Sequence, residues 1–241
     1  MPRFFLPGAP DGEVAVIAGT DAKHIARVLR MRVGEPITLC DQQGYDYSGE
    51  VAEITDEAVL VSITEKIQSV SEPALSVHLF QAIPKSDKME LIVQKSVELG
   101  VSDITPVFTK RCVSRPDARA MAKKVERYQK IALEAAKQSG RGRVPLIHRA
   151  VEFSDALAQM AEYDLPLFFY ERADMPLRDV LYGDYRSVSI LIGSEGGFEE
   201  TEAQRAVVAG CRSVSLGPRI LRCETAPLTA LSVVMYASGN L

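Results

Sequence analysis

The sequence lacks the cysteine and histidine spacings that hold metal ions. Its 4 cysteines lie at positions 40, 112, 211 and 223 without a C-x-x-C pair, and its 3 histidines at 24, 78 and 148 are scattered. Structural metal sites usually draw on such residues in close pairs, so no metal site is predicted. Isolated cysteines are typical of free thiols in a reducing cytoplasm, which is the expected location of this chain.

The chain also lacks a secretory signal and a membrane-spanning run. Its start has no basic region followed by an apolar stretch. The longest uncharged stretch, Thr225–Leu241, contains Pro227 and Gly239 and is too short to cross a bilayer. No membrane partner is therefore expected.

Charge is distributed unevenly, although the net charge is only −4. Between Lys110 and Arg149 there are 12 Lys and Arg against 3 Asp and Glu, so this segment carries +9 and the remainder −13. A basic strip on an acidic body can bind a phosphate backbone locally. The alternative is a solvated helix face that carries residues such as Lys123, Arg127 and Lys130.

Residues 1–72 are predicted to form a small β-barrel. Short apolar runs alternate with Gly, Asp and Pro turn signals, and the runs lie at 4–6, 14–17, 37–40, 51–54 and 59–63. One helix is expected between the second and third runs, with an apolar stripe made by Ile25, Val28 and Leu29.

Three arginines, Arg27, Arg30 and Arg32, project from the other side and the end of this expected helix. They fit contacts with RNA phosphates, and they equally fit a solvated surface. A second arginine pair, Arg141 and Arg143, lies between glycines, where it fits either a phosphate clamp or an exposed turn.

Strands and helices alternate after a linker at Ser69–Pro73, which is the signature of a parallel α/β sheet over residues 73–241. Asp87 and Glu90 resemble a capping box at the start of one of the helices. Strands are expected at 75–83, 104–108, 165–170 and 188–192, and helices at 87–100, 118–138, 199–210 and 226–238. The last helix is apolar around most of its circumference, so we expect it to pack on the sheet and on another subunit.

Two glycine loops follow the strands near 192 and 214, and the carboxyl ends of parallel strands are where ligands bind. The first loop, Gly193–Gly197, is neither a dinucleotide fingerprint nor a Walker A loop nor a nucleophile elbow. Glu195 within it would repel a phosphate. The loops therefore favour a neutral or cationic ligand bound largely by backbone groups, or else they are tight turns without a ligand.

The segments I-G-S-E-G-G-F at 192–198 and L-G-P-R-I-L-R-C-E-T-A at 216–226 resemble the RsmE family of 16S ribosomal RNA uridine-N3 methyltransferases, which belong to the SPOUT superfamily. The resemblance extends to Met1–Phe5, His24–Gly34, Lys88–Gly100 and Glu134–Arg141. Cys223 departs from the family pattern, but its side chain is still small.

This resemblance implies an α/β protein with two domains. Residues 1–72 would be a PUA-like RNA-binding β-barrel, and residues 73–241 a SPOUT methyltransferase domain with a parallel sheet and a deep trefoil knot. It also implies a homodimer, S-adenosyl-L-methionine (SAM) as the cofactor, and 16S rRNA or the 30S subunit as the partner.

The family's cofactor residues carry over to both loops. They are Tyr170, Ile192, Gly193, Glu195, Gly196, Leu216, Gly217, Ile220, Leu221, Arg222, Thr225 and Ala226. Glu195 is expected to bond to ribose or to loop backbone rather than to the sulfonium, because a carboxylate there would stabilise the ground state.

Methylation at N3 of uridine needs a base for the N3 proton and a positive group beside the oxygens that gain charge. Arg222 is the predicted positive group, unless it forms an ion pair with Glu224 or Glu195. Glu224 or Glu171 is the predicted base. Contacts with RNA are predicted for Arg3, Arg27, Arg30, Arg32, Arg111, Arg141 and Arg143.

Two other functions remain open from the sequence. One is a related SPOUT enzyme that methylates transfer RNA or a ribose 2′-hydroxyl. The other is a non-catalytic RNA-binding protein of ribosome assembly that no longer uses a cofactor.

Overall fold

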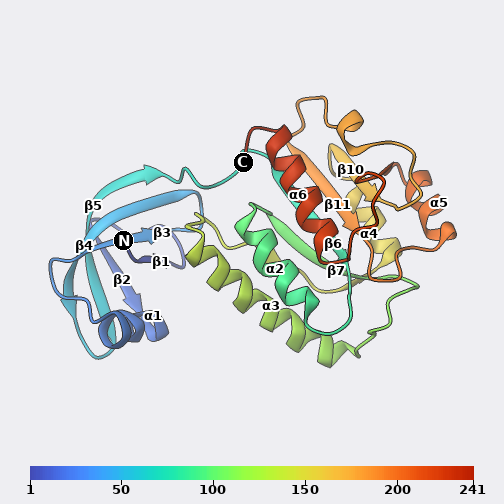
Figure 1. The fold of residues 1–241 in the computed structure, drawn as a ribbon. Helices are drawn as coiled ribbons and strands as arrows, with labels where there is room; N and C mark the ends of the chain where they lie inside the picture. Colours follow the sequence, from blue (N-terminus) through green and yellow to red (C-terminus); the bar gives the residue numbers. More distant parts are fainter. The chain divides into compact units, whose positions relative to one another are not determined.

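The computed structural model describes residues 1–241, which form two compact units (Figure 1). The first unit comprises Met1–Glu72 and Ala136–Val144, and the second comprises Pro73–Ala135 and Pro145–Leu241. None of the helices has both the length and the hydrophobicity that a membrane span requires.

The first unit is built on a five-stranded sheet with the strand order β1-β3-β4-β5-β2. Only the β1–β3 pair is parallel; the other three pairs are antiparallel. Each of the five predicted apolar runs overlaps one of these strands, which are β1 (Arg3–Phe5), β2 (Val14–Ala18), β3 (Pro36–Cys40), β4 (Tyr45–Ile54) and β5 (Ala58–Gln68). Alternate residues face inward, as Ala15 and Ile17 do in β2.

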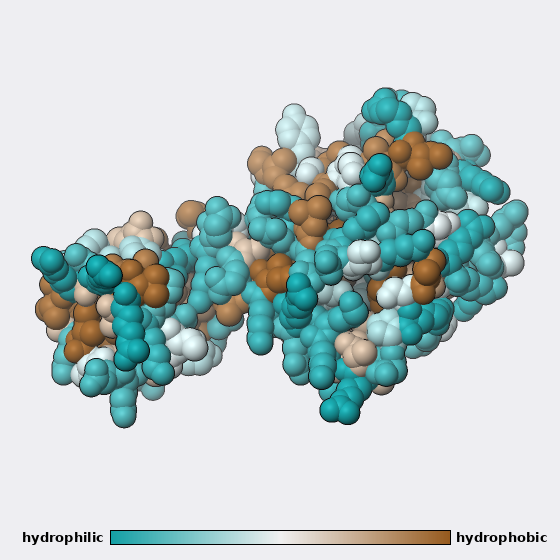
Figure 2. Space-filling model, turned by 60° about the horizontal axis from the view of Figure 1, so that its bottom comes forward, coloured by the Kyte–Doolittle hydropathy of each residue, from teal (hydrophilic) through white to brown (hydrophobic).

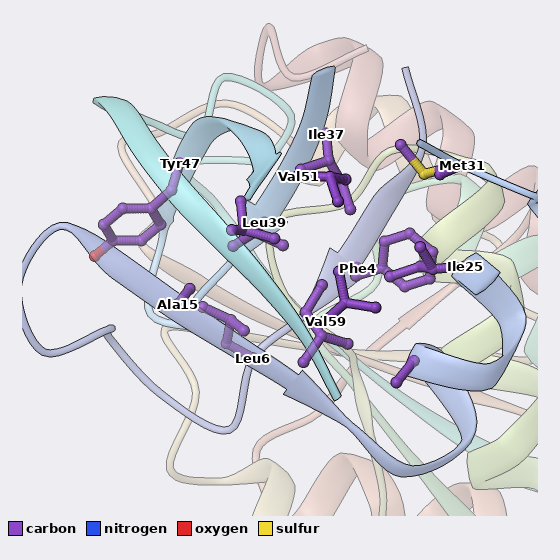
Figure 3. Packing of buried hydrophobic residues seen from close by; sticks show 13 residues of the cluster. Phe4, Leu6, Ala15, Ile25, Met31, Ile37, Leu39, Tyr47, Val51 and Val59 are labelled. Atoms are coloured by element: carbon purple, nitrogen blue, oxygen red, sulfur yellow. The ribbon is translucent and has the colours of Figure 1, made fainter. Parts of the chain in front are cut away.

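The curled sheet encloses one apolar core (Figure 3). Phe4, Ile25, Leu39 and Val59 point into it from different elements and are almost fully buried. Tyr47 also contributes its ring, while its hydroxyl donates to Asp41 Oδ2 at 3.0 Å. The buried hydroxyl is therefore satisfied, which offsets the cost of removing it from water.

The expected apolar stripe of the first helix is wrong for two of its three residues. Ile25 is buried, but Val28 is 66 % exposed and Leu29 is also exposed. The reason is local geometry: α1 (Gly19–Lys23) continues into η1 (His24–Leu29), a π-helical turn. A π turn holds more residues than an α turn, so it rotates the last side chains off the inner face.

The segment 136–144 is fixed to the first unit by Glu72. The Arg141 guanidinium donates to both Glu72 carboxylate oxygens, at 2.8 and 2.7 Å, and the N–H of Gly142 donates to Oε1 at 2.7 Å. Arg141 is only 3 % exposed. The Arg141 guanidinium is therefore buried and occupied by Glu72 within this unit, which does not favour the phosphate clamp considered from the sequence.

The second unit contains a parallel sheet with the order β12-β10-β11-β6-β7-β8, and β9 also pairs with β7. This confirms the predicted α/β class. The strands are β6 (Ser76–Ala82), β7 (Asp103–Phe108), β8 (Leu146–Ile147), β9 (Val151–Glu152), β10 (Leu165–Phe169), β11 (Ser187–Ile192) and β12 (Arg212–Val214). The side chains of β10 and β11 are buried on both faces, which explains the continuous apolar runs there.

Helices cover both faces of this sheet (Figure 1). On one face, α4 (Phe153–Met160) and α5 (Glu200–Val208) pack through Phe153 and Ala206 on Phe80, Phe168 and neighbouring strand residues. On the other, α6 (Thr225–Ala237) packs against β6, β11 and α2 (Lys88–Glu98). The long basic helix α3 spans Ala118–Gln138, as predicted. The trefoil knot implied by the family stays a prediction.

The predicted capping box of α2 is wrong. Asp87 is the N-cap residue but makes no side-chain cap bond, and Glu90 pairs instead with Arg127 at 2.8 Å. A capping box forms at α5, where Glu199 and Glu202 bond to each other's backbone N–H. Aspartate and glutamate three residues apart therefore give a weak signal when an arginine competes for the glutamate.

Apolar side chains remain exposed in places on both units, and Figure 2 shows them as patches among mainly hydrophilic side chains. On the first unit they include Val28 and Val33, close in sequence to Arg27, Arg30 and Arg32. On α6, Val233 and Tyr236 are exposed, the latter at 75 %. The last helix is thus covered on one side only within this chain.

Substituting Arg141 with alanine tests the internal pair. Arg141→Ala leaves Glu72 without its main partner in a largely buried position, so we expect a loss of about 3 kcal/mol in the free energy of unfolding. Urea denaturation followed by circular dichroism measures it. Arg27→Ala, at an exposed position, is the control and should change the value by less than about 0.5 kcal/mol. Equal losses in the two variants would contradict the assignment.

Candidate functional site

The loops that follow four neighbouring parallel strands lie at one edge of the sheet. β12, β10, β11 and β6 lie side by side and run in the same direction. The loops after the first three strands line a cavity of about 820 Å³. The segments are 169–174, 192–198 and 214–223, so the two glycine loops meet in a single cavity as predicted.

Glycines keep the first loop tight against its neighbours. The N–H of Gly197 donates to the carbonyl of Ser194 at 2.9 Å, and Gly197 has φ +63°, a conformation that favours glycine. A Cβ on Gly193 would lie 3.1 Å from the Gly197 Cα, and one on Gly196 would lie 3.0 Å from the Arg111 Cβ. Larger residues would force this part of the cavity wall apart.

Several polar groups along the cavity have no partner within the protein. The backbone N–H groups of Leu216, Ile220 and Leu221 donate no hydrogen bond. The Ser194 hydroxyl is buried and also unpartnered. Buried polar groups are nearly always satisfied, so the Ser194 hydroxyl fits a bound ligand. The three N–H groups belong to exposed or half-buried residues and are open to a ligand that presents acceptors to the loop.

Most of the predicted cofactor residues line this cavity. They are Tyr170, Ile192, Gly193, Glu195, Gly196, Leu216, Gly217, Ile220, Leu221, Arg222 and Ala226. Ile220 lies at the opening and is 88 % exposed. Thr225 lies outside the lining, since it begins α6 and its N–H donates to the Arg222 carbonyl at 2.9 Å.

The predicted acid–base candidates separate in the structure. Glu171 lines the cavity beside Gly197, where its Oε2 lies 3.2 Å from the Cβ position of that glycine. Glu224 lies outside the lining and is engaged by Lys88 and by the Cys223 thiol, which donates to Oε2 at 3.2 Å.

Lys88 lines the cavity, although the sequence predicted for it only a place in a helix and in a family segment, with no role at the site. Its ammonium lies 3.0 Å from Glu195 Oε1 and 3.2 Å from Glu224 Oε2. The sequence carried a usable signal: Lys88 follows the loop after β6, which ends at the same sheet edge as the two glycine loops. Other lining residues missed include Phe169, Asp174, Ser194, Phe198 and Arg219.

Lys88, Glu195 and Glu224 stabilise one another's charged forms. Hydrogen bonds to Glu195 and then to Glu224 raise the pKa of Lys88 above its usual value. Burial favours a higher pKa for Glu195, but bonds from its own N–H, Lys88 and the Lys85 N–H lower it overall. The bond from the Cys223 thiol, with help from Lys88, lowers the pKa of Glu224. All three groups are therefore charged at neutral pH.

Cys223 is a buried thiol in the wall of the cavity. Burial, together with the bond to Glu224, raises the pKa of Cys223 to about 12. It is therefore protonated and a poor nucleophile at neutral pH.

Arg222 makes neither of the ion pairs considered from the sequence. Glu195 and Glu224 are both bonded to Lys88, and Arg222 forms no salt bridge. Arg222 is a lining residue of the cavity and is exposed. A guanidinium that faces a cavity without a protein partner is available to a ligand.

The predicted RNA-binding arginines fall into different environments. Arg27, Arg30 and Arg32 are exposed on the first unit. Arg3 pairs with Asp46 at 2.9 and 2.5 Å, so both Arg3 and Arg141 serve the interior of that unit. Arg111 belongs to the second unit, where it donates to the Gly196 carbonyl at 2.9 Å and so borders the first glycine loop. Arg143 is exposed.

Two histidines and one aspartate come together at the other edge of the sheet, where β6 and β7 begin. His78, Asp103 and His148 have ligand atoms within 4.8 Å of one another. Both ring nitrogens of His78 already bond, to the Tyr163 hydroxyl at 2.6 Å and to Thr105 Oγ1 at 2.8 Å. Burial lowers the pKa of His78 to about 4, so this ring is a neutral part of the core.

The chain matches two families over most of its length. A family described as RNA methyltransferase domain matches residues 71–235, and one described as RNA methyltransferase PUA domain matches residues 17–64. The second match confirms the PUA-like fold expected of the N-terminal region.

Relatives and solved structures agree with these matches. Ribosomal RNA small subunit methyltransferase E of Bacillus subtilis is 34% identical over 232 residues, which cover 93% of this chain and 91% of the relative. The crystal structure of ribosomal RNA small subunit methyltransferase E from Neisseria gonorrhoeae bound to S-adenosyl methionine has a TM-score of 0.89 at 34% identity, covering 98% of this chain and 97% of that one. A methyltransferase from Legionella pneumophila in complex with SAM has a TM-score of 0.87 at 34% identity, with the same coverage.

The fold, the meeting of the two glycine loops and these matches lead to one conclusion. The chain belongs to the ribosomal RNA small subunit methyltransferase E family of RNA methyltransferases.

Proposed function

We propose that this protein transfers a methyl group from SAM to N3 of a uridine in 16S rRNA of the small ribosomal subunit. The observation that carries the proposal is the cavity between the two glycine loops, which Arg222 faces without an ion-pair partner. Family membership supports rRNA as the substrate. Because ribosomal subunits are the partner, the proposed location is the cytoplasm.

The cavity residues suit SAM. The N–H groups of Leu216, Ile220 and Leu221 are free to bond to the acceptor edge of an adenine, and the side chains of Ile192 and Leu221 offer apolar walls. Glu195 accepts the Lys85 N–H through both oxygens at 3.2 Å, in line with its expected bonds to loop backbone. When bound, SAM would supply an electrophilic methyl group on a sulfonium sulfur.

The protein's own residues perform the remaining tasks. A neutral uracil N3 is a poor nucleophile, and loss of its proton places negative charge on O2 and O4. Arg222 would face those oxygens and stabilise the charge. Glu171 is the better placed of the two candidate bases, because it lines the cavity while Glu224 is occupied by Lys88 and Cys223.

The RNA must also be held and the target base exposed. N3 lies on the pairing edge of uracil, so the target is an unpaired or flipped nucleotide. We assign the phosphate contacts of the first unit to Arg27, Arg30 and Arg32, which are exposed, and leave out Arg3 and Arg141, which are paired inside it. Residues 1–72 would then be the RNA-binding domain and residues 73–241 the methyltransferase domain.

A homodimer is part of the same proposal. The exposed apolar side chains on α6, Val233 and Tyr236, would be covered by a second copy. An apolar face of this kind is otherwise unfavourable in water.

Methyl transfer from labelled SAM to 30S particles and to naked 16S rRNA tests the function directly. We expect incorporation into rRNA, mapped by mass spectrometry to a single 3-methyluridine. Methylation of a ribose hydroxyl or of transfer RNA would contradict the proposed target. Absence of SAM binding by calorimetry would favour a non-catalytic assembly protein.

Removing the guanidinium of Arg222 separates binding from chemistry. In Arg222→Ala we expect SAM affinity to stay within about tenfold and turnover to fall at least ~100-fold, the size of effect for a lost charge stabiliser. Arg212→Ala, in β12 outside the cavity lining, is the control and should keep its turnover. Unchanged turnover in Arg222→Ala would remove this residue from catalysis.

The RNA surface can be tested through its salt dependence. Replacing Arg27, Arg30 and Arg32 together by alanine should weaken binding to 16S rRNA and lower the slope of log affinity against log salt by about 2 to 3, since each phosphate contact releases counterions. Filter binding at several salt concentrations measures the slope. An unaltered slope would assign these arginines to a merely solvated surface.

A further inference from the structure

Lys88 connects three segments that are far apart in the sequence. It is the first residue of α2, Glu195 belongs to the first glycine loop, and Glu224 is the residue on which α6 begins. Glu195 is tied to the same place a second time through the Lys85 N–H. One ammonium group therefore links both sides of the cavity to the start of α2.

The position of Lys88 is electrostatically unfavourable for the helix that it begins. The N-terminus of a helix carries a partial positive charge, so a lysine in the first turn is disfavoured there. The chain nevertheless has a lysine at this unfavourable position, and residues that oppose a local preference tend to occur at functional positions. The two carboxylates around the ammonium compensate for it.

Lys88 also affects the interactions of the charged residues around it, Glu195, Glu224 and Arg222. Without it, Glu195 and Glu224 would face each other as like charges at the cavity edge. Glu224 lies only two residues from Arg222 in the second loop, so it would become free to attract that guanidinium.

We propose that Lys88 is a positioning residue, which clamps the two glycine loops into the cofactor-binding arrangement and occupies the carboxylates that would otherwise capture Arg222. The inference rests on the proposed function, because it takes SAM as the ligand. It assigns to Lys88 no contact with the reacting atoms.

Calorimetry with SAM tests the clamp without relying on turnover. We expect Lys88→Met to lower SAM affinity at least ~10-fold and Lys88→Arg to restore it to within about threefold, since arginine keeps the charge. The double variant Lys88→Met with Glu224→Gln should recover part of the loss, because it removes the repulsion. Lys95→Met is the matched control: it deletes a 2.8 Å ion pair with Glu98 on the same helix, away from the cavity.

A pH series distinguishes the charge clamp from simple packing of the lysine side chain. In Lys88→Met, acidification from about pH 8 to about pH 5 should raise SAM affinity, because protonating one of two facing carboxylates relieves their repulsion. The wild-type protein is the reference, since Lys88 holds the pKa values of both carboxylates low and Cys223, with its pKa of about 12, stays protonated. The amino group of SAM and the other charged cavity residues, Glu171, Asp174, Arg219 and Arg222, are the same in both proteins, so the difference in affinity between variant and wild type should shrink on acidification.

The outcomes separate the two proposals. Wild-type protein that binds no SAM would contradict the proposed function. Wild-type protein that binds SAM, with Lys88→Met binding it equally well or losing affinity to the same extent at every pH, would overturn the role of Lys88 alone. Thermal unfolding of each variant shows whether it is folded. If Lys88→Met does not fold, the single variants Lys88→Arg and Glu224→Gln still test the role of the charges.

Discussion

The parallel direction of four neighbouring strands is the constraint on which the rest of the site depends. β12, β10, β11 and β6 are hydrogen-bonded neighbours that run the same way, so the chain leaves all four at one edge of the sheet. Segments that are more than a hundred residues apart in sequence thereby meet around one cavity. A cleft at the carboxyl edge of a parallel sheet is the usual ligand position in such folds, and here it also gathers the charged residues.

The basic residues at this edge of the sheet have two different roles. Lys88 satisfies Glu195 and Glu224, whereas Arg222 has no acidic partner and faces the cavity. The same division occurs among the arginines of the first unit: Arg3 and Arg141 hold internal carboxylates, while Arg27, Arg30 and Arg32 are exposed. Counting basic residues along the sequence cannot separate these roles, because the partners of Arg141 and Lys88 are distant in the chain.

Much of the fold follows from local patterns. The apolar runs identified the first five strands, and the alternation of strands and helices after Pro73 identified the parallel sheet. The resemblance to a family identified half of the residues that line the cavity. The failures had two causes. A local π turn rotates Val28 and Leu29 outward, and a tertiary ion pair with Arg127 holds Glu90, which therefore does not cap α2. Lys88 was missed because its role depends on Glu195 and Glu224, which lie more than a hundred residues away in the chain and are not part of any short motif with it.

A crystal structure of the protein with S-adenosylmethionine tests the central claim most directly. The account predicts the ligand in the cavity between Gly193–Gly197 and Leu216–Arg222, with its adenine bonded to backbone N–H groups of the second loop and the Lys88 ammonium still between Glu195 and Glu224. A ligand bound elsewhere, or a cavity that closes without it while the two loops separate, would contradict the account.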